Sequence, residues 1–93
     1  MNMIEHDPHH THSLEFVIRM TGSTRRKILF YCEKGIVSPV NSEQFFFDEV
    51  AVLRVRRIET LRQHHRMNWA AIYAIMSLED ELESLREESR FRR

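Results

Sequence analysis

The stretch Lys27–Pro39, KILFYCEKGIVSP, decides how the rest of the chain is interpreted. Its first half predicts a short helix whose buried side carries the apolar residues Ile28, Leu29, Tyr31 and Cys32. Gly35 is the left-handed residue expected just past the end of such a helix. Pro39 cannot continue a helix, so an extended or turning segment must follow.

A second short helix is predicted directly before this one. Ser13 can cap a helix over 14–20, LEFVIRM, and the pair Thr21-Gly22 then breaks it. Ser23 or Thr24 caps the helix of the quoted stretch. Two short helices joined by a Thr-Gly turn are the layout of helix-turn-helix proteins.

A small β-ribbon is predicted after Pro39, over residues 40–47, VNSEQFFF, with a polar turn at Asn41-Ser42. A ribbon this short must lie on the helices, so at least one or two of its three phenylalanines should be buried. Asp48 caps a third helix. One face of that helix carries apolar residues at helical spacing, namely Val50, Ala51, Val55, Ile58 and Leu61.

A fourth helix is predicted from Trp69 towards Arg90, with Asn68 as its cap. Its apolar stripe consists of Ile72, Ile75, Leu78, Leu82 and Leu85, and the last four recur at the 3-4-3 spacing of a coiled coil. Such a stripe either docks on its own domain or pairs with another chain. For Leu82 and Leu85 we favour pairing, because few core elements remain to cover them.

Composition favours one small, soluble domain. The chain has 93 residues, of which 42% are hydrophobic and 30% charged. No apolar run approaches the roughly 18 residues that span a bilayer, and the N-terminus lacks the pattern of a signal peptide. The single cysteine, Cys32, fits a reducing compartment, so we expect a cytoplasmic protein.

Charge is balanced in total but segregated along the chain. The formal net charge is zero, whereas small domains that hold DNA by themselves usually carry a basic excess. A basic block consists of Arg54, Arg56, Arg57, Arg62 and Arg66. An acidic block follows and consists of Glu79, Asp80, Glu81, Glu83, Glu87 and Glu88. This segregation predicts electrostatic pairing of surfaces, either within one chain or between chains.

Neither an enzyme nor a metal site is predicted. The chain has no Ser-His-Asp set, and its two glycines cannot form a glycine-rich phosphate loop. The histidines of the first segment (His6, His9, His10 and His12) have poor ligand spacing, so a solvated tail over residues 1–12 is favoured over a metal site. His64 and His65 point about 100° apart on a helix and cannot share a metal. We expect no cofactor.

The order of these elements resembles a known family. Thr21-Gly22, the segment 35–39, Phe47-Asp48-Glu49 and the segment 68–72 resemble the N-terminal domain of MerR-type regulators, and more closely the chaperone-modulator family CbpM. The resemblance covers residues 14–88. It implies a mainly α, MerR-like winged helix-turn-helix with a small β-ribbon wing and a long C-terminal helix. The expected segments are a flexible tail (1–12), a winged-helix domain (13–66) and a dimerisation or partner helix (67–93).

The sequence departs from the DNA-binding members of that group. Where they carry Arg-Tyr-Tyr-Glu in the second helix, this chain has Leu29, Phe30, Tyr31 and Cys32, and its wing has one acid and no base. Cys32 also lies away from the dimer helix, where metal-sensing members need cysteines. If the chain nevertheless bound DNA, the contacting residues would be Arg25, Arg26 and Lys27, supported by Arg54, Arg56 and Arg57. A solvated helix face is the alternative interpretation of Arg25–Lys27.

The resemblance to CbpM implies a partner, a DnaJ-like co-chaperone of the CbpA type, whose J-domain would be blocked from engaging an Hsp70. Candidate acidic contacts for the basic J-domain are Glu79, Asp80, Glu81 and Glu83. Candidate anchors are Trp69 and Tyr73, although a buried core role is favoured for Trp69. We also expect an antiparallel homodimer whose seam consists of Ile75, Leu78, Leu82 and Leu85.

Overall fold

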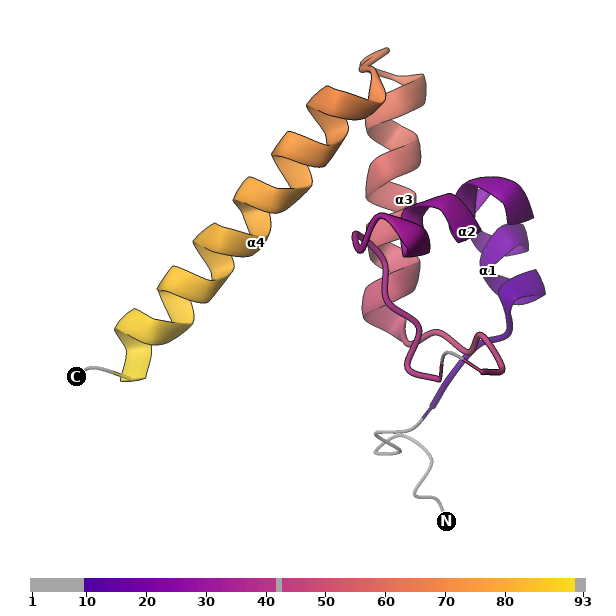
Figure 1. Ribbon diagram of the computed structural model, residues 1–93, viewed down its shortest axis with the longest axis horizontal. Coiled ribbons are helices and arrows are strands. Elements are labelled where there is room, and N and C mark those ends of the chain that lie inside the picture. Colours follow the sequence, from indigo (N-terminus) through magenta and orange to yellow (C-terminus); the bar gives the residue numbers. More distant parts are fainter. Residues whose placement is uncertain (1–9, 42, 92–93) are drawn as a thin grey trace.

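The computed structural model describes residues 10–41 and 43–91, and these residues form four helices. In chain order they are α1 (Leu14–Thr21), α2 (Arg25–Glu33), α3 (Glu49–Gln63) and α4 (Trp69–Phe91). The short helices α1 and α2 lie on one side of α3 (Figure 1). Helix α4 starts beside the end of α3 and then diverges from it, so that the two long helices form a V (Figure 1).

Side-chain caps set where the helices begin. The side chains of Ser13, Thr24 and Asp48 accept hydrogen bonds from backbone N–H groups in the first turns of α1, α2 and α3. Asn68 does the same for α4, since its Oδ1 lies 2.9 Å from the backbone nitrogen of Ala71. These bonds satisfy N–H groups that have no partner inside the helix. All four predicted cap positions are therefore confirmed, with Thr24 rather than Ser23 starting α2.

Two glycines end or follow the short helices. Gly22 is in the left-handed region (φ 75°), and its N–H donates to the carbonyl of Ile18. Gly35 is also left-handed (φ 77°) and lies just after the end of α2, as predicted. A side chain at either position would strain the backbone, because L-residues rarely adopt a positive φ.

One hydrophobic core joins α1, α2, α3, the segment 36–47 and the start of α4. Its fully buried side chains include Val17, Ile28, Val55, Ile58 and Ile72. Val50 was expected on the buried face of α3 but is 61% exposed, and Val52 is buried instead. Ala51, the next residue in the same turn, is 2% exposed, so Val50 points to a different, solvent-facing side of α3.

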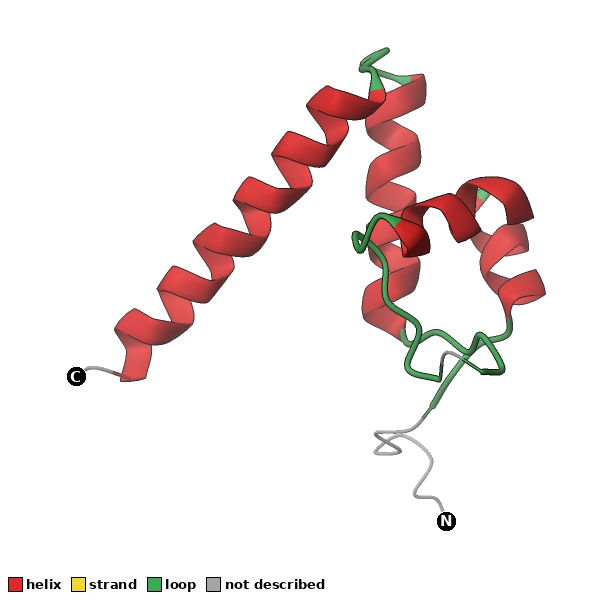
Figure 2. Ribbon diagram, in the orientation of Figure 1, coloured by secondary structure: helices red, strands yellow, loops and turns green. Residues whose placement is uncertain are grey.

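The predicted β-ribbon wing is wrong, because the described residues contain no strand (Figure 2). Between its own described residues, the segment has a single isolated antiparallel bridge, from Asn41 to Phe46. The side chain of Asn41 accepts from the backbone nitrogens of Glu43 and Gln44, each at 3.0 Å, and Phe45 has φ 54°. These local bonds turn the chain at once, so too few residues remain to build a ladder.

The backbone of Phe47 pairs instead with the segment before α1. Phe47 and His12 exchange two backbone hydrogen bonds, of 2.7 and 2.9 Å, and the Phe47 side chain is fully buried. The His12 ring stacks on Phe16 and its Nε2 lies 3.0 Å from Glu49. His6 and His9 of the expected tail lie outside the described residues, whereas His12 is joined to the domain.

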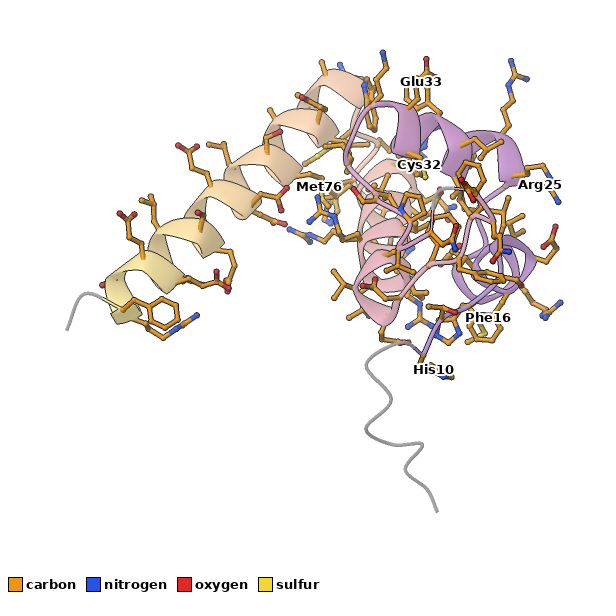
Figure 3. The ribbon with its side chains drawn as sticks, turned by 60° about the horizontal axis from the view of Figure 1, so that its bottom comes forward. His10, Phe16, Arg25, Cys32, Glu33 and Met76 are labelled. Carbon is orange, nitrogen blue, oxygen red and sulfur yellow. The ribbon has the colours of Figure 1, made fainter. Side chains whose placement is uncertain are left out.

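Helix α4 changes character along its length. Ile72 and Met76 are buried against the domain, and Ile75 is partly buried. From Leu78 to Phe91 every described residue is exposed, and this half of the helix projects away from the other elements (Figures 1 and 3). Within the part of the chain that the structure describes, no helix has the length and hydrophobicity needed to cross a membrane.

Candidate functional site

The start of α2 presents the three cations expected to contact DNA, but two of them are occupied. The Arg25 guanidinium donates to the carboxylate of Glu15 on α1, and this hydrogen bond lowers the pKa of Glu15. The Lys27 ammonium lies 3.4 Å from the carboxylate of Glu59 on α3. Arg26 is exposed, and no described carboxylate forms an ion pair with it. Among the described residues, Arg26 is thus the one of the three whose charge has no ion-pair partner.

A buried carboxylate ties α2 to α3. Glu59 is 4% exposed and accepts hydrogen bonds from the Ser23 hydroxyl at 2.7 Å and the Tyr31 hydroxyl at 2.9 Å. Burial alone would raise the pKa of Glu59, but the bonds from Ser23 and Tyr31 and the charge of Lys27 outweigh it, so the pKa is lowered. The pKa of Tyr31 is raised, first by burial and then by its bond to Glu59. Glu59 is therefore ionised and Tyr31 neutral at neutral pH.

Aromatic side chains from α2 and α4 form a cluster beside this carboxylate. Trp69 stacks on Tyr31 with ring centroids 5.7 Å apart, and its ring centroid lies 4.9 Å from that of Phe30 in a T-shaped arrangement. Tyr73 follows one turn later, 6.0 Å from Trp69. Trp69 is partly buried, whereas Phe30 and Tyr73 are 37% and 45% exposed. The two expected anchors thus lie together, and Phe30 joins them.

A surface pocket of about 420 Å³ opens next to the cluster, between α2 and the last turn of α3. Its apolar wall is made by Leu29, Phe30 and Tyr31, and its cationic rim includes Arg26 and Arg62. Cys32 lies on α2 near these residues but is not part of the pocket wall (Figure 3). Partial burial raises the pKa of its thiol, which fits a packing role.

The basic and acidic blocks meet inside one chain. The Arg54 guanidinium binds the carboxylate of Asp80 with two hydrogen bonds, of 2.7 and 3.1 Å, while its Nε donates to the carbonyl of Ile36. Arg57 pairs with Glu79, and that hydrogen bond raises the pKa of Arg57. These pairs connect the middle of α3 to the middle of α4, across the V that the two helices form. The alternative of pairing within the chain, left open by the sequence, applies to Glu79 and Asp80.

The outer half of α4 displays the remaining acidic residues and the leucine stripe. Leu78, Leu82 and Leu85 are 63%, 48% and 56% exposed. Glu81 is exposed, and Glu83 makes only a loose contact with Arg90 at 3.8 Å. Nothing in the described part of the chain covers the stripe, whereas Ile75 at its start is partly buried.

The sequence interpretation missed the roles of two residues. The sequence interpretation gave Glu59 no role, although it lies seven residues after Val52 and four after Val55 and so falls on the buried stripe of α3. Phe30 faces Trp69 across two helices, and no local pattern predicts such a contact. Among the described residues, no group of three His, Cys, Asp or Glu side chains is placed to bind a metal.

Comparison with known families agrees with this arrangement of helices. Residues 13–79 match the family of MerR HTH family regulatory proteins, which covers most of the chain. The chain belongs to the MerR family. No curated protein and no solved structure shows a significant match to it. Membership of the MerR family gives the chain the helix-turn-helix of a regulatory protein, in which α2 is the second helix of the motif.

Proposed function

We propose that this MerR-family chain regulates by binding protein, as an inhibitor of a DnaJ-like co-chaperone of the CbpA type. In this proposal the chain occupies the J-domain and so blocks its access to an Hsp70. No bond is made or broken, and no cofactor is required. Inhibition follows from steric exclusion and from a complementary surface.

One observation carries the proposal: most of the cations expected to contact DNA form ion pairs with carboxylates of the same chain. Of the six residues Arg25, Arg26, Lys27, Arg54, Arg56 and Arg57, four form ion pairs with carboxylates of the same chain. Each such pair would have to be broken, or its charge shared, before a phosphate could be bound. The turn over residues 40–47 adds no cation that could replace them.

The outer half of α4 supports protein binding. It combines exposed leucines with exposed carboxylates and has no cover in the described chain. Glu79 and Asp80 bind Arg57 and Arg54, so Glu81 and Glu83 are the two of the four candidate acidic contacts that remain available to a basic partner. We propose that they face the basic helix of the J-domain, and that α4 also pairs with α4 of a second copy through the leucine stripe.

Reversing two of these charges should slow association with the co-chaperone. Glu81→Lys combined with Glu83→Lys should lower the association rate about tenfold at low salt, because like charges then repel during the encounter. The rate is measured by stopped-flow with a purified DnaJ-like protein from the same organism. Neither substitution removes a carboxylate that pairs with Arg54 or Arg57, so α4 should keep its position relative to α3.

Glu43→Lys is the control for that experiment, since Glu43 is also exposed but lies in the turn over 40–47. It should leave the association rate within about twofold of the wild type. An unchanged rate in the Glu81/Glu83 variant would remove the acidic contact from the proposal. No detectable complex with the wild-type chain would remove the co-chaperone itself.

DNA binding is the second candidate, and membership of the MerR family favours it. Arg26 and Arg56 are the members of the DNA set that form no ion pair with a described residue, so a dimer offers four such cations. The slope of log K against log salt should then be no steeper than about −4. Fluorescence anisotropy with mixed duplex DNA measures it, and Arg26→Ala with Arg56→Ala should abolish what binding there is. Micromolar binding with a slope near −4, lost in the Arg26/Arg56 variant, would favour DNA binding over co-chaperone binding.

A further inference from the structure

The pocket on α2 is built for an apolar group. Leu29, Phe30 and Tyr31 form its wall, and its volume of about 420 Å³ falls at the lower end of the range typical of ligand sites. Phe30 is 37% exposed and faces this space. Burial of one large side chain here would cover apolar surface that water now contacts.

The wall is also held in place before anything binds. The Tyr31 hydroxyl donates to the buried carboxylate of Glu59, so the ring cannot turn without breaking that bond. Trp69 packs parallel to Tyr31, with an angle of 12° between the two ring planes, and meets Phe30 at 65°. A site whose side chains are already fixed loses little conformational entropy on binding.

The rim of the pocket is basic. No described carboxylate forms an ion pair with Arg26 or Arg62, and the Lys34 ammonium lies 5.5 Å from the centre of the Phe30 ring. Lys27 also lines the pocket, but its charge is matched by Glu59. Glu33 is the single acidic residue of the lining. Within the lining, Arg26 and Arg62 therefore outweigh Glu33, and the local potential favours an anion.

We propose that this pocket binds an acidic segment of a partner protein, by taking up one leucine or phenylalanine side chain whose neighbours in that segment carry carboxylates. The apolar wall receives the side chain, while Arg26 and Arg62 receive the carboxylates. The proposal goes beyond the J-domain contact, because the outer half of α4 is acidic and would attract a basic segment. The two surfaces thus select partners of opposite charge.

Duplex DNA fits this pocket less well than an acidic peptide. Both ligands are anionic, but the phosphate backbone has no apolar side chain to enter the space beside Phe30. Two of the cations at the start of α2 are already bound to Glu15 and Glu59. DNA remains one outcome of the experiment that follows.

Trp69 makes the proposal directly testable, because it is the only tryptophan of the chain and stacks on the pocket wall. The probe is a short blocked peptide with two leucines flanked by glutamates, titrated into the full chain while Trp69 fluorescence is recorded. A matched peptide with lysines in place of the glutamates is the comparison. The acidic peptide should bind at least about tenfold more tightly than the basic one.

Variants then test the named residues. Arg62→Glu should weaken binding of the acidic peptide about tenfold, and Arg26→Glu should do the same. Arg56→Glu makes the same charge change on an exposed part of α3 that lines a different surface hollow, so binding should stay within about twofold. Circular dichroism checks that each variant is folded, and Arg62→Gln gives a milder change if Arg62→Glu is not.

Three results would overturn the proposal. The acidic and basic peptides could bind equally well, or Arg56→Glu could weaken binding as much as Arg62→Glu. Alternatively, duplex DNA could bind with a dependence on Arg26 and Arg62 while neither peptide binds. Because the assay contains no co-chaperone, its outcome is independent of the J-domain experiment, and either proposal can fail alone.

Discussion

Replacing Glu59 with alanine is expected to lower the free energy of unfolding by about 3 kcal/mol, the loss typical of breaking a buried charge network. The carboxylate accepts from Ser23 and Tyr31, and Lys27 lies 3.4 Å away. Its removal leaves the buried hydroxyl of Tyr31 without this acceptor and separates α2 from its anchor on α3. Urea denaturation followed by circular dichroism measures the loss, at one fixed protein concentration.

Glu81→Ala is the matched control for Glu59→Ala. Glu81 is an exposed glutamate on α4 with no ion pair among the described residues, so its loss should change stability by less than about 0.5 kcal/mol. Tyr31→Phe removes one donor while keeping the ring, and should fall between the two variants. Equal stability of Glu59→Ala and Glu81→Ala would show that the buried carboxylate stabilises nothing.

The same carboxylate should make stability depend on pH. The pKa of Glu59 is lowered in the folded chain, so its contribution is fully present above its unfolded pKa of about 4.3 and disappears as the pH falls through the lower, folded pKa. Wild-type stability should therefore decrease on acidification below about pH 5, and Glu59→Gln should flatten that decrease. The pKa of Glu15 is lowered too, so Glu15→Gln is needed to separate the exposed pair with Arg25.

Aspartate at Leu82 and Leu85 is expected to convert the proposed dimer into monomers. These side chains are about half exposed and lie on the uncovered stripe of α4. Each buried leucine is worth roughly 1.5–3 kcal/mol, and two-fold symmetry counts every substitution twice, so the dissociation constant should rise by more than about a hundredfold. Sedimentation velocity at micromolar concentration should show the mass fall by half.

Ser84→Asp supplies the control for the stripe. Ser84 lies between the two leucines in sequence but on another side of the helix, so its substitution adds a charge without entering the seam. It should sediment as the wild type does. Because the outer half of α4 is exposed in one chain, the Leu82/Leu85 variant should keep its helix content. If it also keeps its mass, the helices do not pair through this stripe.

Local pattern predicted the helices and their starts well, because both depend on residues close in sequence. A cap needs only a hydroxyl, amide or carboxylate within three residues of a free N–H, as at Ser13, Asp48 and Asn68. The same locality explains the error at residues 40–47. The run of aromatic residues indicated a strand, but the Asn41 side chain satisfied the neighbouring N–H groups and turned the chain.

Contacts between distant residues could not be predicted in the same way. The sequence shows that the charged residues lie in a basic block and an acidic block, but it does not show that Arg54 and Arg57 bind Asp80 and Glu79 of the same chain. The choice depends on the angle at which α4 leaves α3. That angle follows from the packing of Ile72 and Met76 against the core. For Glu79 and Asp80 the tertiary structure therefore replaced a predicted partner contact with an internal one.

The sequence by itself determined four helices, their caps, the left-handed glycine after α2 and the resemblance to MerR-type regulators. Each of these depends on residues that are close together in the sequence. Only the tertiary structure decided which cations remain unpaired, that Glu59 is buried, and that Phe30, Tyr31 and Trp69 share one wall. The physical reason is that charge pairing and desolvation depend on distances through space. Two helices with the same sequences but another crossing angle would expose different charges.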